Sequence, residues 1–210
     1  YGGLGLGALE LCVIAEELGR AAAPVPFSSS VYLGTEAIRI FGTESQKEKW
    51  LPKLAVGEII STFALAETSS EPTEKNIKTL FSGGKVSGQK IPVADGSYAD
   101  IAVVVVKDSD ADMISLAIVE LNSKGVKRNA VSTLDPSRDH ADIIFKDADA
   151  ELMDVGGEGW DAVERVLASA AVLMAFEQIG GAEASLNMAK DYALDRYAFG
   201  RQIGSYQAIK

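Results

Sequence analysis

The sequence predicts an α+β protein of several domains: an N-terminal helical domain over residues 1–58, an all-β domain over 59–155, and the start of a C-terminal helical bundle over 156–210. Two changes in the spacing of apolar residues carry this prediction. Near Ile59 the helical spacing gives way to short β-branched runs, and near Gly156 the helical spacing returns. We therefore expect a sandwich or barrel of at least six strands between two helical segments.

The first domain has the pattern of three helices. Residues 1–7 are glycine-rich and turn-like, and the apolar residues of 8–19 then lie on one helical face. A second helix is expected over 28–41, after a linker whose prolines forbid a helix. Thr43 opens the third helix through a capping box with Gln46.

The central domain contains short β-branched runs separated by turn residues. These runs are Ile60–Leu65, Val103–Val106, Ile114–Val119 and Ile143–Phe145. Ser82-Gly83-Gly84 is typical of a hairpin turn.

A helix of more than thirty residues is expected from Trp160 to about Tyr197. Between Ala162 and Ala182 it is apolar nearly all round, so we expect it to be buried in an oligomer, a dimer or a tetramer. Gly180-Gly181 in its middle indicates close approach of another backbone.

Composition excludes several classes of function. The 210 residues are 47% hydrophobic and 24% charged, which is typical of a soluble globular protein. The net charge of −10 argues against nucleic acid as a partner, and no uncharged apolar run reaches about 18 residues, so no membrane span is expected. The single cysteine, Cys12, fits a reducing compartment, and we expect a cytoplasmic protein. His140 has no partner at ligand spacing, so we expect a surface or loop histidine and no metal site.

The last twenty residues gather side chains that suit a phosphate. A helix is expected to break at 198–201 and a new one to start at 205–207, with Arg196, Arg201 and an aromatic residue close by. Arginine makes charge-assisted bonds to phosphate, and a helix start adds free N–H groups. Together they could hold a pyrophosphate; the alternative is a surface helix-turn-helix with solvated arginines.

This segment resembles a known signature. The pattern R-x-x-F-G-R-x-I-x-x-x-Q over 196–207 is similar to that of the acyl-CoA dehydrogenase family. Further blocks resemble the family in the same order: Y-G-G-L-G over 1–5, E-E-L-G-R over 16–20, F-G-T-E-S-Q-K with W-L-P over 41–52, and G-E-G-W over 157–160. The resemblance implies an acyl-CoA dehydrogenase-like fold. It also implies a longer subunit, of which this sequence is a part.

The resemblance implies a flavoprotein oxidoreductase. It would carry out FAD-dependent α,β-dehydrogenation of an acyl-CoA thioester in fatty acid or steroid catabolism, with electron-transfer flavoprotein as the acceptor. Arg196, Phe199 and Gln207 would contact the FAD of a neighbouring subunit. The catalytic glutamate is expected beyond Lys210, because Ala170 lies near the position that carries it in some relatives.

The subunit's own flavin would lie against Leu65 and Ala66 and against Val93 and Ala94. Both segments depart from the family pattern, since alanine replaces a hydroxyl residue at 66 and again at 94. T-S-S-E-P-T over 68–73 replaces the family's P-x-x-G-S-D. Only backbone groups would then hold the isoalloxazine, each hydrogen bond being worth about 1 kcal/mol.

Ser70 and Ala171 are the candidate substrate contacts, and the alanine-lined helix fits bulky as well as long acyl groups. Three interpretations remain open: a dehydrogenase subunit, a degenerate subunit that completes the FAD site of a partner chain in a hetero-oligomer, and a dimerising scaffold without flavin.

Overall fold

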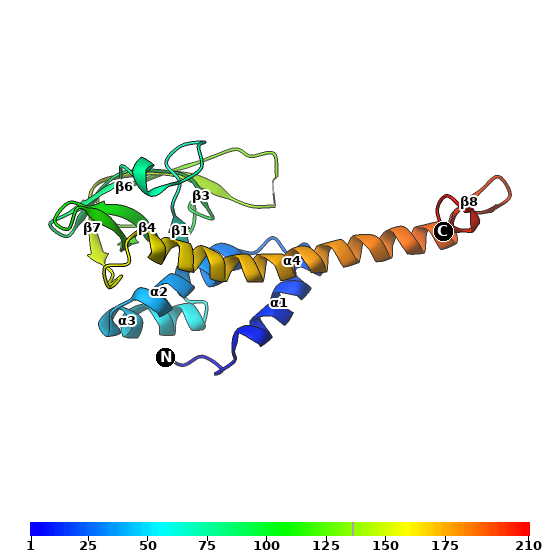
Figure 1. Cartoon of the computed structure of the whole chain (residues 1–210), viewed down its shortest axis with the longest axis horizontal. Coiled ribbons are helices and arrows are strands. Elements are labelled where there is room, and N and C mark those ends of the chain that lie inside the picture. The colour runs from blue at the N-terminus through cyan, green and yellow to red at the C-terminus, as the bar shows by residue number, and fades with distance from the viewer. Residues whose placement is uncertain (136) are drawn as a thin grey trace. The chain divides into compact units, whose positions relative to one another are not determined.

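The structure is a computed structural model that describes residues 1–135 and 137–210. The chain forms two compact units, one of residues 1–5 and 24–170 and the other of residues 6–23 and 171–210. The first unit contains the sheet, and the second contains the first helix and the last part of the long helix (Figure 1). The domain boundaries at residues 58 and 155 stay a prediction.

The helices, in chain order, are α1 (Ala8–Arg20), the π-helix η1 (Ser28–Thr35), α2 (Glu36–Phe41), α3 (Glu44–Ala55), the 3₁₀ turn η2 (Glu74–Asn76), α4 (Trp160–Asp195) and the 3₁₀ turn η3 (Ile203–Ser205). The strands are β1 (Ser61–Ala64), β2 (Leu80–Ser82), β3 (Lys85–Ala94), β4 (Ile101–Asp108), β5 (Met113–Glu120), β6 (Val126–Ala130), β7 (His140–Leu152), β8 (Tyr197–Ala198) and β9 (Arg201–Gln202).

Among the described residues, seven strands form one sheet, as the sequence predicted. Backbone hydrogen bonds link β4, β2, β3, β7 and β5 in a closed circuit, while β1 joins β4 in parallel and β6 joins β7. The turn between β2 and β3 lies at Gly83 and Gly84, both with positive φ, which confirms the predicted hairpin. The closed circuit removes free edges from most of these strands.

Two apolar clusters hold the first unit together. One lies between sheet and helices and includes Phe41, Trp50, Val103 and Val163. The other fills the sheet's opposite side around Val104 and includes Val93. Strand β4 is buried along nearly its whole length because alternate residues face the two clusters.

The helix expected over 28–41 begins at residue 28 and ends at Phe41, but its first eight residues form a π-helix rather than an α-helix. This π-helix lies against β1: the backbone N–H of Ser61 donates to Ser30 Oγ at 3.1 Å. The predicted capping box at Thr43 is confirmed, with Thr43 N–H donating to Gln46 Oε1 at 2.9 Å and Gln46 N–H to Thr43 Oγ1 at 3.3 Å.

In the second unit α1 packs on α4 through glycine. A Cβ on Gly180 would lie 1.8 Å from the carbonyl oxygen of Glu16, and one on Gly19 would lie 1.7 Å from that of Glu177. The expected close approach of another backbone at Gly180 is therefore confirmed.

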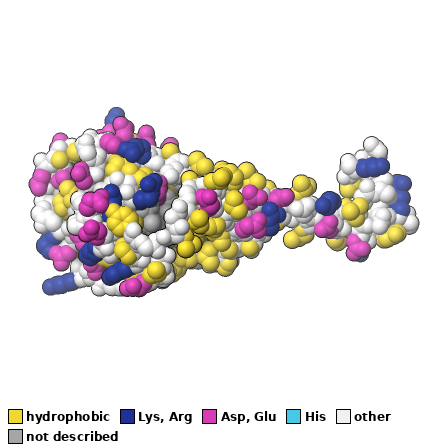
Figure 2. Space-filling model, turned by 90° about the horizontal axis from the view of Figure 1, so that it is seen from below, with side chains coloured by type: hydrophobic (Ala, Val, Ile, Leu, Met, Phe, Trp, Pro, Cys, Tyr) yellow, Lys and Arg dark blue, Asp and Glu magenta, His cyan; other side chains and the backbone are white. Residues whose placement is uncertain are grey.

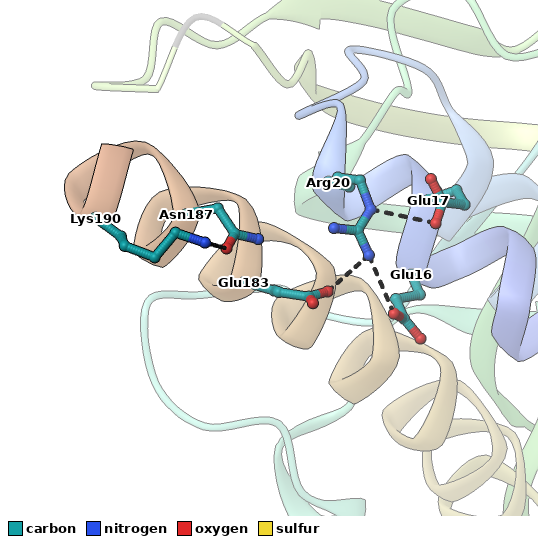
Figure 3. Close-up of polar contacts among 6 residues, drawn as sticks. All are labelled: Glu16, Glu17, Arg20, Glu183, Asn187 and Lys190. Carbon is teal, nitrogen blue, oxygen red and sulfur yellow. Dashed lines mark hydrogen bonds and ion pairs between the residues drawn. The ribbon is translucent and has the colours of Figure 1, made fainter. Parts of the chain in front are cut away.

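Arg20 stabilises the same contact between α1 and α4 (Figure 3). Its guanidinium donates to Glu183 at 2.7 Å, to Glu16 at 3.3 Å and to Glu17 at 3.2 Å. The motif E-E-L-G-R over 16–20 thus supplies both the glycine and the arginine of this contact.

The helix α4 has 36 residues, which confirms the expected length. Its residues in the second unit leave hydrophobic side chains exposed in this chain, as α1 does, and Figure 2 shows such side chains gathered over α1. They include Leu9, Val13 and Ile14 on α1, and Val172, Ile179, Leu186 and Met188 on α4. Their burial in an oligomer stays a prediction.

Candidate functional site

A buried ion pair joins the two segments that the sequence assigns to the flavin. Lys90 on β3 is fully buried, and its Nζ donates to Glu67 Oε1 at 2.8 Å and to the carbonyl oxygen of Leu65 at 3.0 Å. Beside it the N–H of Ile91 donates to the carbonyl oxygen of Ala66 at 2.8 Å. The chain that follows β1 is therefore tied to β3 at three consecutive residues.

The Glu67 carboxylate also anchors the approach to β2. It accepts the backbone N–H groups of Lys78 at 2.8 Å and Thr79 at 2.9 Å. Gly88 makes room for this segment, because a Cβ at that position would lie 2.7 Å from Thr79 Cα. The family-like G-x-K pattern over 88–90 therefore combines a close backbone approach with a buried cation.

Burial and pairing act against each other on the two ionisable groups. Burial lowers the pKa of Lys90 to about 8, although Glu67 opposes the change. Burial alone would raise the pKa of Glu67, but the Lys90 ammonium and the N–H of Thr79 hold it below its usual value.

The four residues expected at the subunit's own flavin lie in this part of the first unit. Leu65 and Ala66 are half-buried beside β3, and the hydroxyl of Thr62 donates to the carbonyl oxygen of Ala94 at 2.6 Å. The side chain of Val93 is buried in the cluster around Val104, which leaves only its backbone for a ligand.

Two backbone donors are unused at this place. Within residues 1–135 and 137–210, the N–H groups of Ala66 and Glu67 make no hydrogen bond. Ala66 and Ala94 have no polar side-chain atom, so these N–H groups are what the segment offers to an acceptor. The chain therefore fits an isoalloxazine in part, through its backbone.

The three residues expected at a neighbour's FAD lie in the second unit, around a β-hairpin. The predicted break at 198–201 coincides with the hairpin of β8 and β9. The 3₁₀ turn Ile203–Ser205 leads into the predicted helix start at 205–207, where the N–H of Lys210 donates to the carbonyl oxygen of Tyr206 at 3.1 Å, a helical i to i+4 bond. Phe199 is 98% exposed at φ +52°, and Arg196 and Gln207 are exposed.

Arg196 and Arg201 differ in their surroundings. In the described part of the chain the Arg196 guanidinium has no polar partner, whereas that of Arg201 lies 3.8 Å from the ring centroid of Tyr206. Among the described residues, Arg196 and Phe199 thus present an unpaired cation and an exposed aromatic ring on one short hairpin. This combination suits a phosphate with an aromatic group next to it.

The two expected substrate contacts belong to different units, Ser70 to the first and Ala171 to the second. Ser70 is exposed after β1, where its N–H donates to Thr68 Oγ1 at 3.2 Å, and Ala171 is exposed at the start of the second unit's share of α4. His140 is not a loop residue: it is the first residue of β7, pairs with Ala94 and is half-buried.

Sequence reasoning did not single out Lys90 and Glu67 as a site, although both matched the family pattern. A signal was present, because residues 86, 88 and 90 share one face of β3 and the first of them faces the core. A lysine on that face requires a buried acidic partner.

Two features are absent from the described residues: a membrane-spanning helix and a cluster of metal ligands. No helix there is long and apolar enough to cross a membrane. No group of three or more histidine, cysteine and acidic side chains there is placed to hold a metal ion.

Comparison with known proteins gives the same assignment from both ends of the chain. Residues 1–58 match the family described as "Acyl-CoA dehydrogenase, N-terminal domain", and residues 157–210 match "Acyl-CoA dehydrogenase, C-terminal domain". An acyl-CoA dehydrogenase of Bacillus subtilis is 33% identical over all of this chain and 59% of its own length. This chain thus spans about three fifths of that relative.

Solved structures agree in fold. The acyl-CoA dehydrogenase of Bacillus anthracis complexed with FAD matches all of this chain and 38% of its own, with a TM-score of 0.90 and 27% identity. The ChsE4-ChsE5 complex from Mycobacterium tuberculosis matches 99% of this chain and 56% of its own, with a TM-score of 0.84 and 26% identity. The motifs, the fold and these matches agree, and the chain belongs to the acyl-CoA dehydrogenase family.

Proposed function

We propose that this chain is a subunit of an FAD-dependent acyl-CoA dehydrogenase and that its C-terminal hairpin binds the FAD of a neighbouring subunit. The supporting observation is the hairpin itself. Arg196 and Phe199 are exposed there, and the guanidinium has no partner in the described part of the chain. A charged donor and an exposed aromatic ring that contact no polar group of the described chain suit a ligand that another subunit holds.

Each part of the chain has a separate task in this proposal. The guanidinium of Arg196 would bind the pyrophosphate, and Phe199 and Gln207 would contact the adenine side. The N–H groups of Ala66 and Glu67 would hold the ring system of the subunit's own flavin. A bound flavin supplies the two-electron acceptor for dehydrogenation of an acyl-CoA. The acyl group would pass near Ser70 and Ala171.

A second candidate is a degenerate subunit that completes a partner's site. Ala66 and Ala94 remove two side-chain donors from the subunit's own flavin segments. Glu71 and Pro72 stand within the stretch where the family has P-x-x-G-S-D, so this stretch also departs from the family pattern. The relative in the ChsE4-ChsE5 complex carries two chain types in its name, which supports a hetero-oligomer.

The ratio of flavin to protein absorbance separates these candidates. The full-length subunit is purified alone and after co-expression with a relative that keeps the T-E-P-x-x-G-S-D pattern. A degenerate subunit gives well under one FAD per chain alone and about one FAD per pair with its partner.

The other outcomes are equally informative. One FAD per chain in the lone protein, with oxidation of an acyl-CoA, establishes a homomeric dehydrogenase. Absence of flavin from both preparations contradicts both candidates and leaves the dimerising scaffold.

A further inference from the structure

The segment after β1 is held by an internal cation that no step of the proposed function uses. Lys90 is the buried lysine of β3, and its ammonium donates to Leu65 and Glu67, two of the three residues that follow β1. The N–H of Ile91 donates to Ala66, the residue between them. Surface ion pairs contribute little to stability, and a buried pair is costly to desolvate, so that it adds little net stability either. The position of this pair therefore needs a reason beyond stability.

Peptide geometry supplies that reason. In a trans peptide the C=O of one residue and the N–H of the next point in opposite directions. The C=O of Leu65 is directed at Lys90 Nζ and the C=O of Ala66 at the N–H of Ile91, both on β3. The N–H groups of Ala66 and Glu67 consequently point away from β3, and both lack a partner in the described chain.

We propose that Lys90 is a positioning residue: with Glu67 it fixes the backbone of residues 65–67 so that two adjacent N–H groups face outward as donors for the acceptor edge of a flavin ring. The proposal rests on the proposed function for the identity of the ligand. The clamp, meaning the Lys90–Glu67 pair and the bond from Lys90 to Leu65, does not depend on the proposed function, because it is built entirely from this chain. Loss of the side-chain donors at positions 66 and 94 increases the importance of this backbone geometry.

The groups around the ammonium are few. In the described chain Glu67 is the charged group that acts on Lys90, and the exposed Lys78 contacts the pair through its backbone N–H. Gln89, next along β3, points its amide to Asp142 on β7 at 2.7 Å. Replacing both members of the pair by neutral residues therefore leaves neither partner as an unpaired buried charge.

The test uses the full-length subunit with two matched double variants. The clamp variant is Lys90→Met with Glu67→Gln, which removes both charges. The control is Lys85→Met with Asp149→Asn, an exposed pair at 2.6 Å between β3 and β7. Hydrogen exchange is measured without flavin on the amides of Lys78, Thr79 and Ile91.

Exchange of these amides should be at least tenfold faster in the clamp variant and unchanged in the control. A second measurement gives the dissociation constant for FAD from quenching of flavin fluorescence, which should rise at least tenfold in the clamp variant and stay within twofold in the control. Lys90→Arg, which keeps the cation, should restore part of the affinity. Unchanged exchange or unchanged FAD affinity in the clamp variant overturns the proposal.

The two proposals fail separately. If the wild-type protein binds no FAD, alone or with its partner, the proposed function is wrong, while the exchange measurement still decides whether Lys90 fixes this segment. If the clamp variant does not fold, the wild-type protein provides the test. Above pH 8 the buried Lys90 is mostly neutral, and it takes up a proton when local opening exposes it. Opening therefore becomes less favourable as the pH rises, and protection of these amides should increase from pH 8 to 9.5 after correction for intrinsic rates. Constant or falling protection overturns the clamp.

Discussion

The proposed function is tested most directly by substitution of Arg196. Its guanidinium has no polar partner in the described chain, so Arg196→Ala removes no recognised hydrogen bond or ion pair there and should leave the thermal midpoint within about 1 °C, as for an ordinary surface substitution. Any loss of FAD affinity then reports on the ligand alone.

The magnitude follows from the charge. One charge-assisted hydrogen bond to a phosphate contributes roughly 1.5 to 3 kcal/mol. The dissociation constant for FAD should therefore rise by about one to two decades. The assay is titration of the apo-oligomer with FAD, followed by flavin fluorescence. Because phosphate binding is electrostatic, the effect should shrink as salt increases.

Arg201→Ala is the matched control, since Arg201 lies on the same hairpin but is stacked on Tyr206. It should change FAD affinity by less than a factor of about three, the equivalent of a weak exposed contact. Equal losses for both arginines would indicate a general charge effect. No loss for Arg196→Ala would refute the assignment of the pyrophosphate to this hairpin.

Three further predictions concern stability. Thr43→Ala removes the capping box of α3 and should lower the free energy of unfolding by about 1 kcal/mol in denaturant titration; no change would contradict the cap. Gly180→Ala places a Cβ 1.8 Å from the carbonyl oxygen of Glu16 and should lower the free energy of unfolding by several kcal/mol, about the loss typical of overpacking or more. Gly181→Ala, whose Cβ would lie 3.3 Å from the nearest atom, should lower it clearly less. Equal losses would refute the close packing of α1 on α4. Lys90 has a pKa of about 8 in the folded chain, below the value of about 10.4 in an unfolded chain. Burial of the charged amine therefore lowers the free energy of unfolding fully below pH 8, and this loss disappears as the pH rises. The free energy of unfolding should rise between pH 8 and 10 by up to about 1.4 kcal/mol per unit, and Lys90→Met with Glu67→Gln should lack this rise.

Elements with a local cause could be predicted from the sequence. The capping box at Thr43 and the diglycine turn at Gly83 are each complete within a few residues, and the apolar run of α4 extends over many turns. The order of helices, sheet and long helix followed from the period of apolar residues alone.

The elements that differed depend on contacts from elsewhere. The π-helix Ser28–Thr35 lies against Ser61, which is far along the chain, and a Cβ on Gly34 would meet Ser61 Oγ at 2.4 Å. The hairpin after α4 requires Phe199 at φ +52°, a conformation that bulky residues rarely adopt, so a local pattern does not favour it. His140 joins β7 through its pairing with Ala94.

The candidate site was predictable only in part. The resemblance to the family singled out the two segments that we propose to hold the flavin, and hydrogen bonds from Ile91 and Lys90 join these segments in the structure. Which carbonyls are occupied, and therefore which N–H groups are free, depends on backbone orientation that a sequence pattern does not contain.

The glycine contact between α1 and α4 also sets an order of events during synthesis. Arg20 and its partner Glu183 are 163 residues apart, so α1 leaves the ribosome long before the surface it packs on exists. At about 5–20 residues per second the interval is roughly 8 to 30 seconds. During that time α1 exposes Leu9, Val13 and the bare backbone of Gly19, while the sheet of the first unit is completed behind it. Throughout that interval the nascent chain therefore carries α1 without the helix that packs on it.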